Sequence, residues 1–213
     1  DGVSDEVYVF AARDAKTSAF QMNVLCFNSK KTAGYVGMDP DLEEDLDAYQ
    51  AVSDASWTLF QAHLAEAQGC AKAQEAFDAG LKRGQVDKGL QDKVGALNLN
   101  AHINHLMSVG TKDGEWIYEY GLKDPVDGVV PGFSRTFGKR CTMCYGYALS
   151  LGGAAGYQVT EVWKGSINKD IGFYCATLIF DAIDEAIPSV GAYRKWISKL
   201  GFLLANNDEI PSF

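Results

Sequence analysis

Apolar residues in this chain recur mostly at the three- to four-residue spacing of amphipathic helices. Between residues 41 and 69 they are separated by polar residues and alanines, and Asp39 or Asp41 is placed to cap the start of a helix. The positions on this face are Leu42, Leu46, Tyr49, Val52, Phe60 and Leu64. Gly69 is expected to end the helix, and a second helical stretch is expected to run to about Ala79, before Gly80.

The same spacing predicts four further helical segments. These are residues 85–109, which contain Gly89 and Gly95, then 138–163, 170–187, which end before Pro188, and 190–205. The sequence therefore predicts a mainly α fold of five or six helices, in a single domain over residues 1–213.

Two regions lack this periodicity. Residues 7–10 and 20–27 are rich in β-branched and aromatic side chains, which predicts an irregular N-terminal region with a short β-hairpin. Residues 110–138 combine glycines and prolines with Trp116-Ile117-Tyr118, which predicts a long ordered loop with one short strand. If the chain has a domain boundary, we expect it within residues 110–137.

Residues 140–163 form an unusual helical segment, because no charge follows Arg140 until Glu161. Small residues recur along it at positions that let a helix approach a neighbour closely. These are Gly146, Ser150, Gly153 and Gly156. A membrane-spanning helix needs about 20 mostly apolar residues. This segment is rich in Gly, Ser and Tyr, and residues 171–187 carry three acids, which are costly in lipid. We therefore expect both segments to be buried helices of a soluble fold. A position in the membrane would require other proteins packed around them.

Composition excludes some classes of protein. A hydrophobic fraction of 47% argues against disorder, and a net charge of −9 without a basic run argues against nucleic-acid binding. The chain has five cysteines, an odd number that does not form a disulfide framework. Cys26–Cys70 and Cys141–Cys175 bridges both stay open at this point.

Two cysteines and two histidines suggest a metal site. His102 and His105 share one face of a helix, and Cys141 and Cys144 form a Cys-x-x-Cys pair. Two imidazoles and two thiolates can complete the tetrahedral shell of a structural zinc ion. The hypothesis requires the two pairs to meet in space.

The same Cys141-x-x-Cys144 pair also suggests thiol chemistry. A thiol at a helix N-terminus, beside Lys139 and Arg140, would have a lowered pKa and could act as a nucleophile or redox centre. No histidine follows His105, so the cysteine-then-histidine order of papain-like enzymes is missing. A cysteine-dependent enzyme or redox protein stays as an alternative function.

The start of this segment, Arg140-Cys141-Thr142-Met143 followed by a Gly- and Ala-rich helix, resembles the Arg-x-Ala-Met helix start of chlorophyll a/c-type light-harvesting proteins. The resemblance implies that Arg140 pairs with a glutamate whose carboxylate ligates chlorophyll magnesium. It also implies chlorophyll and carotenoid as cofactors and a plastid thylakoid location. Further pigment ligands would be His63, His102, His105 and Gln158. The chain differs from the family at Thr142 and Arg135 and has one copy of the motif, which indicates an antenna-associated protein rather than a regular antenna.

The leading hypothesis is therefore a non-catalytic subunit or linker of a larger assembly. Its partners would be other protein subunits, with membrane association through those partners. The alternatives are a cysteine-dependent enzyme or redox protein and a structural zinc protein.

Overall fold

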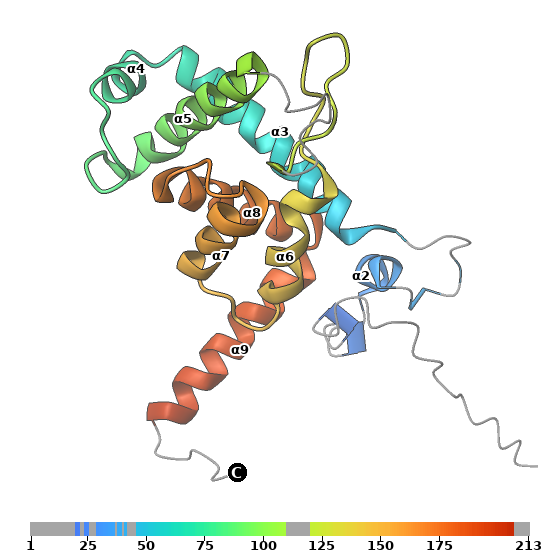
Figure 1. Ribbon diagram of the computed structural model, residues 1–213. Helices are drawn as coiled ribbons and strands as arrows, with labels where there is room; N and C mark the ends of the chain where they lie inside the picture. The colour runs from blue at the N-terminus through green and yellow to red at the C-terminus, as the bar shows by residue number, and fades with distance from the viewer. Residues whose placement is uncertain are drawn as a thin grey trace, which may run out of the picture.

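The computed structural model describes residues 20–21, 24–25, 29–36, 38–39, 41, 46–109 and 120–206, and within these residues it is helical and contains no strand (Figure 1). Eight α-helices and one π-helical turn have both their bounds there, which confirms the mainly α prediction but exceeds the expected five or six helices. They are α2 (Lys30–Tyr35), α3 (Ala48–Gln68), α4 (Ala71–Asp78), α5 (Lys88–Val109), α6 (Arg135–Tyr145), α7 (Leu151–Tyr157), the π turn (Gln158–Val162), α8 (Lys169–Ala186) and α9 (Pro188–Asn206).

The two additional helices arise where the sequence pattern was weakest. One is α2, in a region expected to be irregular, with Ser29 accepting a hydrogen bond from the backbone N–H of Thr32 as its cap. The other arises because residues 138–163, expected as one helix, form α6 and α7 with a connection at 146–150 between them. In that connection Ala148 has a φ of 59°, a left-handed conformation that cannot continue a right-handed helix.

The predicted N-terminal β-hairpin is wrong at those of its residues that the structure describes. Residues 20–27 were expected to be extended, but the described residues among them, Phe20, Gln21, Val24 and Leu25, are helical. Phe20 is fully buried in the main core, so its apolar character reflects core packing rather than a strand. The predicted strands at residues 7–10 and Trp116–Tyr118 lie outside the described residues.

Helix boundaries differ from expectation where a tertiary contact competes with a local signal. The cap of α3 is Asp47, which accepts hydrogen bonds from the backbone N–H groups of Tyr49 at 2.9 Å and Gln50 at 3.2 Å, rather than Asp39 or Asp41. Asp47 is also paired with Arg135 of α6, with 2.6 Å between Oδ2 and Nε. At the other end of the chain, Pro188 is the first residue of α9, where its missing N–H and fixed φ are compatible with a helix.

The core is built around α8, which lies in the middle of the body and packs against α3, α5, α6, α7 and α9 (Figure 1). Nine residues of α8 are buried. Beside it, aromatic rings from α3, α6 and the loop before α6 form a cluster. In this cluster the rings of Phe133 and Phe137 are stacked, with 3.8 Å between their centres. A smaller apolar cluster joins α4 to α5 around Ala73 and Leu97. Among the described residues, no helix is long and apolar enough to cross a membrane.

Close helix contacts occur at several glycines that were not predicted for this role, among them Gly95, Gly138 and Gly172. A Cβ added to Gly95 of α5 would overlap the Tyr174 ring of α8. One added to Gly138 of α6 would lie 2.9 Å from the Ser53 Oγ of α3, and one added to Gly172 of α8 would lie 3.0 Å from the Ala155 O of α7. These helices therefore approach at distances that leave no room for a methyl group.

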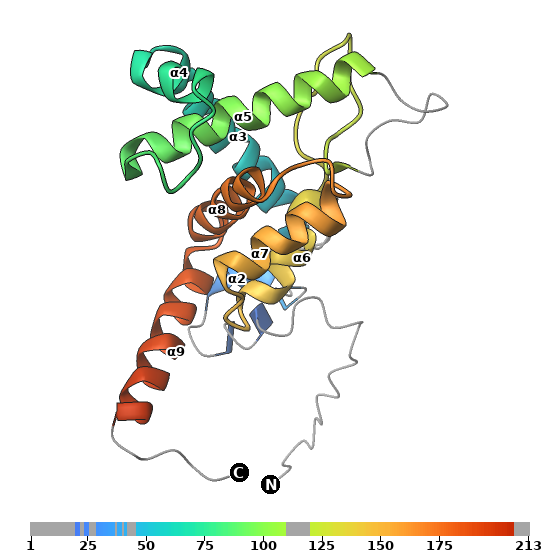
Figure 2. The same cartoon turned by 60° about the vertical axis from the view of Figure 1, so that its left-hand side comes forward.

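Two elements project from opposite ends of the body (Figures 1 and 2). The loop before α6 contains the bridges Leu122↔Phe133 and Val126↔Val129, and its tip turns through Asp127 and Gly128, whose φ values of 51° and 76° are typical of a type I′ turn. We call residues 122–133 the bridged loop. The other projecting element is α9, whose first turns contact α8 and whose remaining length extends away from the body.

Candidate functional site

Cys141, the first cysteine of the Cys-x-x-Cys pair, does not have the environment of a reactive thiol. Cys141 and Cys144 are the seventh and tenth of the 11 residues of α6, so they lie in its C-terminal half and not at a helix N-terminus. Cys141 is fully buried, and burial raises its pKa to about 11. At neutral pH its thiol is therefore protonated, which makes it a poor nucleophile.

The cysteines among the described residues are all free. They are Cys70, Cys141, Cys144 and Cys175. The Cys141–Cys175 bridge left open by the sequence is therefore not formed, and Cys70 is not bridged; Cys26 lies outside the described residues. Cys175 is also fully buried, which raises its pKa.

Gln158 lies at the centre of a small polar cluster inside the core. Its Nε2 donates to Phe137 O at 3.0 Å and lies 3.7 Å from Cys141 Sγ, and its Oε1 accepts from Trp163 Nε1 at 3.3 Å. Gln158 and Trp163 are five residues apart, and the π turn brings them together through a backbone hydrogen bond from Trp163 N to Gln158 O. Both polar atoms of this side chain are thus engaged within the protein.

The three histidines lie in different surroundings. His63 of α3 shares a 3.1 Å hydrogen bond between its Nδ1 and Tyr174 Oη, while His102 of α5 has Nε2 at 3.1 Å from Ser166 Oγ and packs edge-on against Trp163. Burial, and then the neighbouring His105, lower the pKa of His102. His105 itself is exposed.

These positions do not assemble the predicted zinc site. Across the residues that the structure describes, no three His, Cys, Asp or Glu side chains gather closely enough to hold a metal ion, and His102, His105, Cys141 and Cys144 are all among those residues. The sequence spacing could place each pair on one helix face but could not say whether the faces meet.

Arg140 is exposed on α6 and interacts with α7 and the π turn. Its guanidinium lies 5.0 Å from the centre of the Tyr157 ring. Hydrogen bonding to Tyr157, and then the charge of Glu161, raise the pKa of Arg140. A glutamate of the same chain therefore contributes, after Tyr157, to the electrostatic surroundings of this arginine.

The small residues of this segment act mainly at helix ends. Gly146 is the C-cap residue of α6, and Ser150 caps α7 by accepting a hydrogen bond from Gly153 N at 3.0 Å. A Cβ on Gly156 would have no heavy atom within 4 Å. The close contacts expected at these positions are made instead at Gly95, Gly138 and Gly172.

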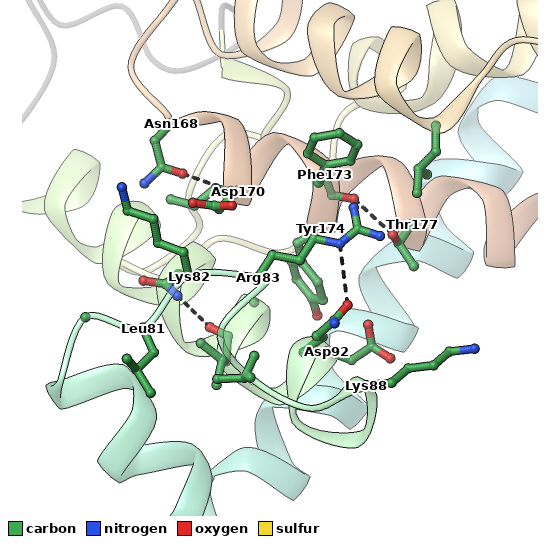
Figure 3. Close-up of a pocket in the computed structure, with 18 of the residues that line it drawn as sticks. Leu81, Lys82, Arg83, Lys88, Asp92, Asn168, Asp170, Phe173, Tyr174 and Thr177 are labelled. Atoms are coloured by element: carbon green, nitrogen blue, oxygen red, sulfur yellow. Dashed lines mark hydrogen bonds between the residues drawn. The ribbon is translucent and has the colours of Figure 1, made fainter.

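A cavity of about 500 Å³ lies between the α4–α5 loop, α5 and α8 (Figure 3). Three cations, Lys82, Arg83 and Lys88, and three acids, Asp92, Asp170 and Asp181, line it. The guanidinium of Arg83 already interacts within the protein. It lies 4.6 Å from the centre of the Phe173 ring, and its Nε donates a hydrogen bond to Gln91. With equal numbers of both charges, the lining does not select an anionic or a cationic ligand.

Exposed apolar side chains concentrate on the two projecting elements. At the tip of the bridged loop, Val126 is 62% and Val129 is 66% exposed. On α9 the exposed side chains are those of Trp196, Ile197, Leu200, Phe202 and Leu203. Sequence analysis predicted a helix over residues 190–205, but apolar spacing alone could not tell how much of its surface is exposed.

No family model, curated protein or solved structure was found that matches this chain.

Proposed function

We propose that this chain is a non-catalytic linker subunit that connects two other components of a larger assembly. The observation that carries the proposal is the pair of projecting elements, the bridged loop and α9, at opposite ends of one helical body (Figures 1 and 2). Each element presents large apolar side chains to solvent. Exposed apolar patches of this kind mark interaction surfaces.

The free energy available at these surfaces is substantial. Burying one Val, Leu or Phe side chain against a partner stabilises an association by about 1.5–3 kcal/mol before the costs of binding. At the tip of the bridged loop, the backbone groups of Val126 and Val129 hydrogen-bond each other at 2.9 and 3.0 Å. A partner therefore meets apolar side chains there without having to satisfy these backbone groups.

The burial of Cys141 favours this proposal over an enzyme that uses Cys141 as its nucleophile. A catalytic thiol must reach its substrate as a thiolate. The Cys141 thiol is instead fully buried in the core, and burial raises its pKa to about 11. Its polar neighbours, Gln158 and the Ala154 carbonyl, are neutral groups and supply no general base.

The most concrete setting that we propose is a photosynthetic antenna or photosystem in the plastid thylakoid. The resemblance at Arg140 implies an arginine–glutamate pair, and in this chain Arg140 is influenced by Glu161 across α6 and the π turn. Within this proposal, exposed His105 and the Glu161 carboxylate are the positions best suited to a chlorophyll magnesium. Visible absorption of the gently isolated chain, compared between His105→Leu and the unaltered protein, tests pigment binding.

Site-specific photo-crosslinking in the source cells tests the linker function. A photoreactive residue is placed at Val129 in the bridged loop, at Leu200 in α9, or at Glu75, an exposed residue of α4 that serves as the control. The expected result is a covalent adduct to another protein from Val129, an adduct to a different component from Leu200, and neither adduct from Glu75. Absence of an adduct at Val129 or at Leu200, or the same adducts from Glu75, would overturn the proposal.

A further inference from the structure

We infer that α9 attaches this protein to an anionic lipid surface, lying in the plane of the interface with its apolar face toward the acyl chains. The inference rests on the proposed function to the extent that α9 is one of the two attachment elements. It goes further because it identifies the component at that end as lipid, contacted directly rather than through partner proteins.

The first observation is the position of the apolar residues on α9. Tyr193, Trp196, Ile197, Leu200 and Leu203 follow one another at steps of three or one, so they lie on one face of the helix. Trp196 is 51% and Leu203 is 48% exposed. Aromatic and leucine side chains on one face are typical of helices that lie at a membrane interface.

The second observation is the charge of this helix. Residues 188–206 contain Arg194, Lys195 and Lys199 and no Asp or Glu, whereas the whole chain has a net charge of −9. The remaining residues therefore carry −12. An anionic surface attracts α9 and repels the body, so electrostatics favours contact through this helix alone.

The third observation is how α9 is held. Near its start, Arg194 donates to Leu149 O at 2.7 Å and lies over the rings of Tyr145 and Phe180, at 4.3 and 4.7 Å from their centres. Tyr145 in turn donates to Asp184 at 2.8 Å. The root of the helix is thus fixed to the body.

Beyond this root, every residue from Lys195 to Leu203 is exposed, and α9 extends away from the body (Figure 2). A flat lipid surface needs only one face of such a helix, and Lys199 can extend from its margin to the headgroups, whereas Lys195 Nζ is paired with Asp184 Oδ2 at 3.4 Å.

Vesicle binding of the full chain tests the inference. The probes are vesicles of phosphatidylglycerol, which is anionic, and of phosphatidylcholine, which has no net charge, with binding measured by flotation and by tryptophan fluorescence. We expect binding to phosphatidylglycerol that weakens as salt is added, and little binding to phosphatidylcholine. No binding to phosphatidylglycerol, or equal binding to both lipids, would overturn the inference.

Three variants show which element binds. Leu200→Glu should weaken binding to phosphatidylglycerol by more than about tenfold, because it removes a leucine that the lipid would bury and adds a negative charge that the anionic lipid repels. Lys199→Glu should weaken it through charge alone. Val129→Glu, at an exposed apolar position on the bridged loop, is the control and should bind as the unaltered chain does. All three positions are exposed, and circular dichroism verifies that each variant is folded. Equal binding by Leu200→Glu and Val129→Glu would contradict the inference.

The two proposals can fail separately. If the chain does not bind vesicles but Leu200 crosslinks to a protein, the linker function stands and the lipid inference is wrong. If the chain binds vesicles through α9 but Val129 yields no protein adduct, the lipid inference stands and the linker function is wrong.

Discussion

The polar cluster around Gln158 allows a quantitative test of the core. Gln158→Leu keeps the side chain close in size but removes the acceptor of the Trp163 indole N–H, which is fully buried. A buried donor left without its partner costs about 1–3 kcal/mol. The Cys175 thiol also contacts this indole, but sulfur is a weak acceptor and replaces little of the loss. We therefore expect the free energy of unfolding to fall by about 2 kcal/mol, which in a chain of 213 residues corresponds to a melting temperature lower by about 4–8 °C.

The assay is urea and thermal unfolding followed by far-ultraviolet circular dichroism. Gln74→Leu is the control, because Gln74 is exposed on α4 and bonds only the neighbouring Asp78 in the described structure, so the expected change is within about 0.5 kcal/mol. A double-mutant cycle with Trp163→Phe isolates the hydrogen bond, and we expect a coupling energy of at least about 0.5 kcal/mol. Additive effects of the two substitutions, or a Gln158→Leu protein as stable as the Gln74→Leu protein, would refute the reasoning.

Two further predictions concern close packing and pH. Gly138→Ala should destabilise the fold by about 1–3 kcal/mol because its Cβ would lie 2.9 Å from Ser53 Oγ and 3.2 Å from Tyr49 O, whereas Gly156→Ala, with open space around it, should stabilise α7 by about 0.5–1 kcal/mol. Urea unfolding of both variants checks the opposite signs, and a shift in the same direction would contradict the packing argument. Burial raises the pKa of Cys141 from 9.0 to about 11, so its contribution to stability is complete below pH 9 and is lost as the pH rises to 11. Unfolding free energies measured across this range should therefore fall less steeply in Cys141→Ala than in the unaltered chain, and equal slopes would show that this thiol is not the cause.

Much of the helical layout could be predicted from the sequence, because helix formation depends on local signals. Gly69 ends α3, and Gly80, with a φ of 66°, follows α4 as expected from a residue that tolerates left-handed backbone. The segment predicted over 170–187 corresponds closely to α8. Its apolar spacing and the following Pro188 are both contained in the sequence itself.

The candidate sites were less predictable, since they depend on which distant residues come together. Cys141 and Gln158 are separated by 17 residues and by the break between α6 and α7, yet they meet in the core. Gly95 was expected only to weaken a helix, but it is where α5 packs against the Tyr174 ring. Spacing along the chain contains no information about either contact.

The sequence by itself determined that the chain is mainly helical and where most of its helices lie, because periodicity and capping act over a few residues. Only the tertiary structure decided which apolar faces are covered. Residues 171–187 and 193–203 have similar apolar spacing, yet α8 is enclosed by five helices while most of α9 is exposed. The physical reason is that burial depends on neighbours supplied by the rest of the chain, and among the described residues α9 packs on α8 through its first turns while Lys195–Leu203 are exposed.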